Sequence, residues 1–184
     1  LAALRERSLI SAEDAGPEMR FSMLEALREF AVERLEPAER SEMERKHAMA
    51  YLRFAEEAAR GLQSRDVAGW LYRLEGQHDN LRAALEHCLG PGGDAGMAAR
   101  LAGALAGFWE HHGHFPEGRR FLVRALAAPL DPASRLVALN AAGRLAVCQG
   151  DSTEGAKYGA EALAIATELG DRRGEALALK NLGF

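Results

Sequence analysis

Three histidines within four residues mark the strongest candidate for metal chemistry in the chain. They are His111, His112 and His114, and Glu110 precedes them. Imidazole nitrogens suit zinc, copper or nickel. Ligands on one helix, however, must be three or four residues apart to share a face. These histidines are adjacent and lead into a turn, so the sequence favours polar residues at a helix end and predicts no metal site.

The other ionisable side chains form no catalytic pattern. No pair of carboxylates, and no serine or cysteine beside a base, has the spacing of an active site. His47 and His78 are lone histidines within helical stripes, so a structural role is favoured for both. Beside His78, Asp79 or Asn80 could bond the backbone or an adjacent helix. The sequence therefore predicts no catalytic or cofactor-binding residue, and an enzyme is the class it favours least.

Composition limits the possible partners and compartment. The 184 residues include 23 Lys and Arg against 27 Asp and Glu, a net charge of −4 that argues against broad binding to nucleic acid. Cys88 and Cys148 lack ligand spacing and occupy apolar helical positions, which predicts buried free thiols in a reducing compartment. No segment reads as a membrane span or a signal peptide. We expect a cytoplasmic protein without membrane contact.

The chain contains an internal repeat with a constant offset of 37 residues. Such a period is typical of a solenoid of helix pairs, in which each unit covers the apolar face of its neighbour. Solenoids usually hold partners and seldom catalyse reactions. The matched residues are Gly113 with Gly150, Glu117-Gly118 with Glu154-Gly155, and Ala125-Leu126 with Ala162-Leu163, and Leu182-Gly183 begins a third copy.

These patterns predict the elements that must position any site. Helix pairs are expected at 95–112 with 115–128 and at 132–149 with 153–169, and a partial helix from 172. Upstream we expect a helix at 1–8, a hairpin of 9–11 with 19–23, and a helix at 24–35. Two long helices should follow Pro37. The first carries a stripe of Met43, His47, Ala50, Phe54 and Ala58, and the second runs from Val67 to Cys88. The glycine-rich segment 90–94 predicts a boundary or flexible joint.

Two segments resemble signatures of a known family. Residues 20–31 read R-F-S-M-L-E-A-L-R-E-F-A, and residues 70–85 read W-L-Y-R-L-E-G-Q-H-D-N-L-R-A-A-L. They resemble bacterial signal-transduction ATPases with numerous domains (STAND), including LuxR-type and AfsR-like transcriptional regulators. The helix turns, and Leu169-Gly170-Asp171, resemble tetratricopeptide repeats. The family order is a P-loop ATPase core, a winged helix and a helical repeat sensor, with a DNA-binding domain at one terminus.

The resemblance implies three regions. Residues 1–35 correspond to a partial winged helix, 37–90 to a connecting long helix pair, and 95–184 to tetratricopeptide-like repeats truncated at the C-terminus. No G-x-x-x-x-G-K-[ST] occurs, so ATP or ADP and Mg²⁺ are expected only in a missing ATPase core. The chain departs from the repeat pattern at Gly118 and Gly155, where alanine is usual. Glycine costs a helix about 1 kcal/mol against alanine, so softer repeats are expected.

The predicted fold is therefore all-α. It is an α-solenoid of tetratricopeptide-like helix pairs with a small N-terminal winged-helix remnant, a helix plus a short β-hairpin. In such arrays the first helix of each pair lines a groove. A positive subset of that groove could hold an anionic ligand or an acidic peptide end, or could consist of ordinary solvent-facing charges. The predicted groove residues are Arg100, Glu110, His111, Asn140, Arg144, Val147 and Lys180, of which Arg100, Asn140, Arg144 and Lys180 form the positive subset.

The function expected from these features is a non-enzymatic sensor or protein-interaction module of a bacterial transcriptional regulator. It would bind a protein or small-molecule effector and control an ATPase core of the same protein, with DNA bound only through missing domains. A second copy could cover Leu177, Leu182 and Phe184 at the truncated end. One alternative is a general peptide-binding scaffold without an ATPase. The other is a DNA binder that uses residues 1–35 as a winged helix.

Overall fold

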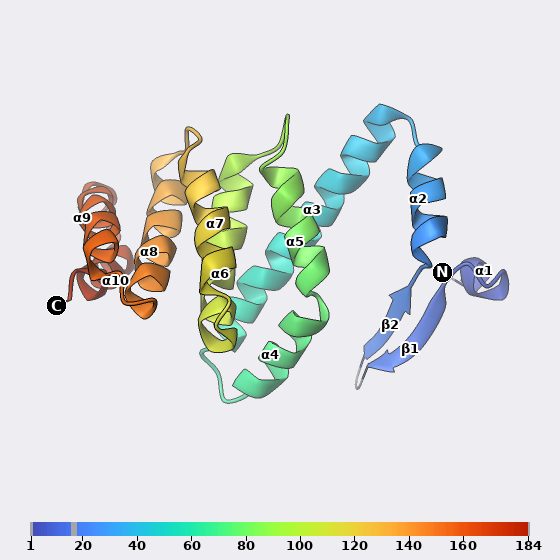
Figure 1. Ribbon diagram of the computed structural model, residues 1–184, viewed down its shortest axis with the longest axis horizontal. Helices are drawn as coiled ribbons and strands as arrows, with labels where there is room; N and C mark the ends of the chain where they lie inside the picture. The colour runs from blue at the N-terminus through green and yellow to red at the C-terminus, as the bar shows by residue number, and fades with distance from the viewer. Residues whose placement is uncertain (1, 16–17, 184) are drawn as a thin grey trace. The chain divides into compact units, whose positions relative to one another are not determined.

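The computed structural model describes residues 2–15 and 18–183, which contain ten α-helices and one β-hairpin (Figure 1). The prediction of a predominantly helical protein is confirmed. The chain forms two compact units, Leu1–Met43 and Glu44–Phe184. Among the described residues, no helix combines the length and apolar character needed to cross a membrane.

The first unit begins with a helix, a hairpin and a second helix. The strands pair antiparallel, with Ser11 opposite Ser22. The sequence placed the first strand too early, because pairing with the second strand extends it through residues expected in the turn. The elements are α1 (Ala2–Glu6), β1 (Ser11–Ala15), β2 (Glu18–Ser22) and α2 (Glu25–Glu33).

Eight further helices follow in the described chain, and the last five match the predicted repeat helices within two residues. Aspartates at the N-caps of α6, α8, α9 and α10 accept hydrogen bonds from backbone N–H groups of the first turn, which explains these sharp starts. The elements are α3 (Pro37–Gly61), α4 (Val67–Gly76), α5 (His78–Cys88), α6 (Ala95–His112), α7 (Phe115–Leu126), α8 (Pro132–Cys148), α9 (Ser152–Leu169) and α10 (Arg172–Leu182).

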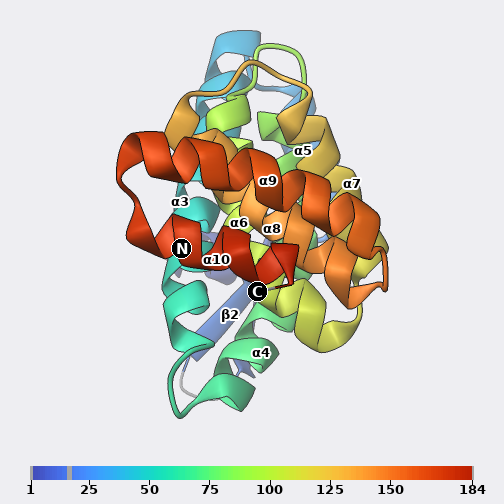
Figure 2. The same ribbon diagram turned by 90° about the vertical axis from the view of Figure 1, so that its left-hand side faces the viewer.

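In the second unit the helices pack mainly on their neighbours along the chain. Helix α6 contacts α7 and α8, and α8 contacts α9 and α10. Figure 2 shows α9 and α10 side by side at the C-terminal end of this unit. Each helix pair therefore covers part of the pair before it.

The core of this unit is continuous from α3 to α8 and contains the fully buried rings of Phe108, Trp109 and Phe121. It includes residues on both sides of the segment 90–94. That segment is thus a connection within one unit, and the predicted boundary there is wrong. Local glycine content signals a turn, whereas the packing of the flanking helices decides whether a turn divides two cores.

Two expectations about the long helices also need correction. The predicted second helix is broken at Gln77 into α4 and α5. On α3 the predicted stripe is correct at Ala58, which is buried, and wrong at Ala50, which is exposed, and at Met43, which is 57% exposed. Four side chains of this helix are buried in the core. They are Ala48, Leu52, Ala55 and Ala58. Small alanines at these positions let neighbouring helices approach closely.

The repeat glycines lie where paired helices approach closely, as expected. A Cβ on Gly118 would lie 2.5 Å from Trp109 Cε3 and 2.6 Å from Leu145 Cδ1. A Cβ on Gly155 would lie 2.5 Å from Val147 Cγ2. Glycine at these positions removes the steric conflict, which offsets its cost in helix propensity.

Candidate functional site

The 37-residue offset extends further upstream than the repeat identified from sequence, into α5. Arg82 and Arg119 occupy equivalent positions, as do Glu117 and Glu154. In the structure Arg82 of α5 bonds Glu117 of α7, and Arg119 of α7 bonds Glu154 of α9. The second helices of successive units are therefore linked by the same pair of positions.

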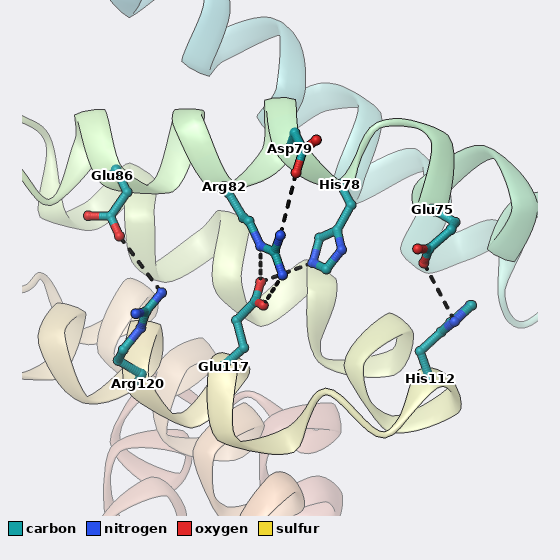
Figure 3. A network of polar contacts seen from close by, with 8 residues as sticks. All are labelled: Glu75, His78, Asp79, Arg82, Glu86, His112, Glu117 and Arg120. Carbon is teal, nitrogen blue, oxygen red and sulfur yellow. Dashed lines mark hydrogen bonds and ion pairs between the residues drawn. The ribbon is translucent and has the colours of Figure 1, made fainter.

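At the α5–α7 junction the carboxylate of Glu117 contacts two side chains of α5, Arg82 and His78 (Figure 3). Arg82 donates to both oxygens of Glu117, from Nε at 2.9 Å and from Nη2 at 2.5 Å. His78 Nε2 lies 2.9 Å from Glu117 Oε1. The side chains of His78 and Glu117 are only 10% and 16% exposed. The Arg82–Glu117 bond is thus bidentate, the geometry in which such pairs are strong, and it joins a largely buried carboxylate to an arginine that is 43% exposed.

The charge state of Glu117 follows from these neighbours. Burial acts to raise the pKa of Glu117, but the hydrogen bonds from Arg82 and His78 and the nearby positive charge outweigh it. The net result is a lowered pKa, because the partners favour the charged carboxylate. The reciprocal bond raises the pKa of Arg82. This junction is an ion-paired contact between helices.

The same junction opens on one side as a shallow depression lined by Arg82, Pro116, Glu117 and Arg120. Arg120 Nη2 lies 3.9 Å from a Glu86 oxygen. Both arginines thus face carboxylates of the protein itself, and the arrangement suits helix-to-helix attachment better than capture of an anion.

At the α7–α9 junction Arg119 is shared among several acceptors. Its Nη1 donates to Gln149 Oε1 at 2.8 Å, and its Nη2 lies 3.1 Å from Asp151 Oδ2 and also contacts Glu154. The side chains of Asp151 and Glu154 are 41% and 36% exposed. Water therefore reaches the carboxylates of this junction more easily than it reaches Glu117, whereas Arg119, 24% exposed, is less accessible than Arg82, 43% exposed.

The predicted groove residues are not all brought together. Asn140 is buried, donating from Nδ2 to Gly174 O at 3.2 Å, and its backbone oxygen accepts from Asn181 Nδ2 at 3.0 Å. Its placement on an open groove is wrong, because it bonds α8 to α10. Val147 lies over Gly155, and Arg100 pairs with Glu56 of α3 at 2.5 Å.

A subset of the predicted residues does meet, on the first helices of three successive units. Arg144 of α8 pairs with Glu110 of α6, and Cys148 Sγ lies 3.6 Å from Glu110 Oε1. Lys180 of α10 is close enough to influence the thiol electrostatically. We call Glu110, Arg144, Cys148 and Lys180 the α6–α8–α10 cluster. It contains both signs of charge, unlike the positive group predicted from sequence.

The two cysteines differ in a way that the sequence did not predict. Cys88 is buried, and burial together with Asp94 raises its pKa to about 11. Cys148 is exposed, which corrects the prediction that both thiols are buried. Partial burial and then the charge of Glu110 raise the pKa of Cys148, against lowering contributions from Arg144 and Lys180.

The adjacent histidines His111 and His112 have different neighbours in the structure. His111 Nδ1 lies 2.7 Å from Gly107 O of its own helix. His112 instead lies beside Glu75 of α4, with His112 Nδ1 and Glu75 Oε2 3.5 Å apart (Figure 3). Ligand atoms of Glu75, His112 and His114 all lie within 4.8 Å of one another. The chemistry open to this group is metal coordination.

Two of these contacts, Arg82 with Glu117 and Glu75 with His112, were not predicted from the sequence. The Arg82–Glu117 contact could have been found by extending the 37-residue offset upstream, because both residues recur at Arg119 and Glu154. The same offset relates Glu75 to His112, which follows it by 37 residues, but it does not show which way the two side chains point. Their contact depends on how α4 packs near the α6–α7 turn.

Searches against protein-family models, curated proteins and solved structures found no match.

Proposed function

We propose that the chain is a non-enzymatic sensor module whose helix pairs form a tetratricopeptide-like solenoid. The observation that carries this proposal is the repeated link between equivalent positions, Arg82 with Glu117 and Arg119 with Glu154. A stack in which each unit contacts its neighbours through the same positions is the organisation of a solenoid. Solenoids present long surfaces for partners.

The first helices of the pairs are the surface on which the partner binds. They carry the α6–α8–α10 cluster and exposed apolar side chains, with Val137 41% and Leu177 43% exposed. Within the described residues no carboxylate forms an ion pair with Lys180, so its charge is open to an anionic group. An acidic peptide end or an anionic effector fits this combination, since it gains a charged contact beside apolar surface.

The wider context rests on the resemblance at residues 20–31 and 70–85. It supports placement of the module in a cytoplasmic bacterial transcriptional regulator of the STAND type, next to a winged helix and an ATPase core. The helix, hairpin and helix of residues 2–15 and 18–33 agree with the winged-helix part of that proposal. The partner would bias the core between inactive and active arrangements, which requires different affinities for the two.

The surface is tested by charge reversal in the full-length regulator. Lys180→Glu, and separately Arg144→Glu, should abolish the effector response in a promoter-reporter assay. The matched control is Lys157→Glu, the same charge change at an exposed position on α9. A normal response from both variants, with unchanged helical circular dichroism, would contradict binding on the first helices.

The assignment to a STAND regulator has a separate test. The coding sequence upstream of residue 1 should encode a P-loop, G-x-x-x-x-G-K-[ST]. If the gene encodes no P-loop, the module is a general peptide-binding scaffold.

A further inference from the structure

We propose that Glu75, His112 and His114 form a binding site for one divalent transition-metal ion, with zinc as the ion whose chemistry fits best. The proposal rests on the meeting of a carboxylate from α4 with two imidazoles that flank the α6–α7 turn, and it is independent of the partner that the module binds.

Two features of the fold bring the three side chains together. His112 ends α6 and His114 is the N-cap of α7. Between them Gly113 adopts φ +74°, a left-handed conformation that glycine accepts without strain and that turns the chain sharply. The two imidazole rings consequently lie nearly parallel, with centroids 5.8 Å apart. Glu75, near the end of α4, supplies the third group.

The distances are close to those of a metal site. Zinc binds imidazole nitrogen and carboxylate oxygen at about 2.0–2.2 Å, so tetrahedral ligand atoms lie about 3.3–3.5 Å apart. Glu75 Oε2 and His112 Nδ1 already have a separation of 3.5 Å. All three ligand atoms lie within 4.8 Å, and side-chain rotation can close the remaining gap. Three protein ligands leave a fourth position for water.

Neighbouring side chains hold the two rings in place. His114 stacks on His78, with ring centroids 5.1 Å apart, and His78 Nε2 is engaged by Glu117 at 2.9 Å. His112 packs on the buried ring of Phe108, with centroids 4.8 Å apart. Such support around the ligands reduces the ordering that metal binding requires. His78 is therefore a positioning residue for the site.

The site is accessible from solvent, and it includes only two of the three neighbouring histidines. The carboxylate of Glu75 is 52% exposed, so an ion can reach the site from solvent. His111 is outside the group because its Nδ1 faces Gly107 O. The bound ion would tie α4 to the α6–α7 turn, where the first predicted repeat pair connects its two helices.

The test is calorimetric titration of the untagged chain with ZnCl₂. We expect one equivalent of Zn²⁺ to bind, and His112→Ala and Glu75→Gln each to weaken binding at least about tenfold. The matched control is His111→Ala, which removes an adjacent exposed imidazole and should leave the affinity unchanged. Cys148→Ser should also leave it unchanged, which excludes the exposed thiol as the ligand.

A second measurement does not depend on the folding of any variant. Co²⁺ added to the wild-type chain should give the visible absorption of a four- or five-coordinate site, and Zn²⁺ should displace it. The proposal is overturned if the wild-type chain binds no Zn²⁺, or if well-folded His112→Ala and Glu75→Gln retain full affinity. An equal loss in His111→Ala would also overturn it.

Discussion

The α5–α7 and α7–α9 junctions use the same two repeat positions in different surroundings. At the first, Glu117 is 16% exposed and is bonded by Arg82 and His78. At the second, Glu154 is 36% exposed and shares Arg119 with Asp151. Charges interact more strongly where water is excluded, and a buried charge that loses its partner is costly. Equivalent positions in a repeat therefore need not contribute equally to stability.

The largest difference should appear when each glutamate is removed. Glu117→Ala leaves the buried imidazole of His78 and the guanidinium of Arg82 without their acceptor, and should lower the free energy of unfolding by about 2–3 kcal/mol. Glu154→Ala should cost less, about 1 kcal/mol, because the Glu154 carboxylate is more accessible to water and its loss leaves no buried histidine without an acceptor. Urea unfolding followed by circular dichroism measures both. Equal losses would show that the surroundings do not distinguish the junctions.

A smaller difference is expected from the equivalent glycines. Gly118→Ala pushes a methyl group against the buried side chains of Trp109 and Leu145, and should destabilise by about 1–2 kcal/mol after the gain in helix propensity. At Gly155 the nearest side chain is Val147, which is 40% exposed and so has solvent on one side into which it can shift. Gly155→Ala should stay within about 0.5 kcal/mol of wild type. Thermal unfolding of the two variants measures both stability losses. A larger loss in Gly155→Ala than in Gly118→Ala would contradict the packing argument.

The first junction should also respond to acid. Because Arg82 and His78 lower the pKa of Glu117, its contribution is complete above the unfolded-state pKa of about 4.3 and is lost as the pH falls through the folded-state value. The stability gap between wild type and Glu117→Ala should therefore narrow from about pH 6 to about pH 3. Denaturant titrations across this range measure the gap. A gap that stays constant or widens would contradict the ion pairing.

The smallest effect is expected for Asp151→Asn. Asp151 caps α9, and asparagine is an equally good N-cap, so the change removes only the charge beside Arg119. At this exposed position the loss should be no more than about 0.5 kcal/mol by urea unfolding. A loss comparable with that of Glu117→Ala would mean that the α7–α9 junction depends on a network as strong as the first.

Much of the local structure was predictable from short-range patterns. Apolar spacing and helix start and stop signals placed α6 to α10 within two residues, and the structure puts the repeat glycines at close helix contacts. The candidate groove was only partly predictable. Glu110 and Arg144 do meet, but Asn140 turns into the interface with α10, because a polar side chain can satisfy buried backbone groups as readily as face solvent.

The sequence by itself determined the helical class, the boundaries of α6 to α10 and the 37-residue period, since capping and apolar periodicity are visible in short segments of the chain. Only the tertiary structure decided which side chains meet across helices. The 37-residue offset places Glu75 and His112 at equivalent positions, but only the structure shows that the carboxylate lies 3.5 Å from that imidazole. That contact depends on the packing of α4 near the α6–α7 turn, which helix patterns do not encode. The contacts of α7 with α5 likewise leave Glu117 less accessible to water than its equivalent, Glu154.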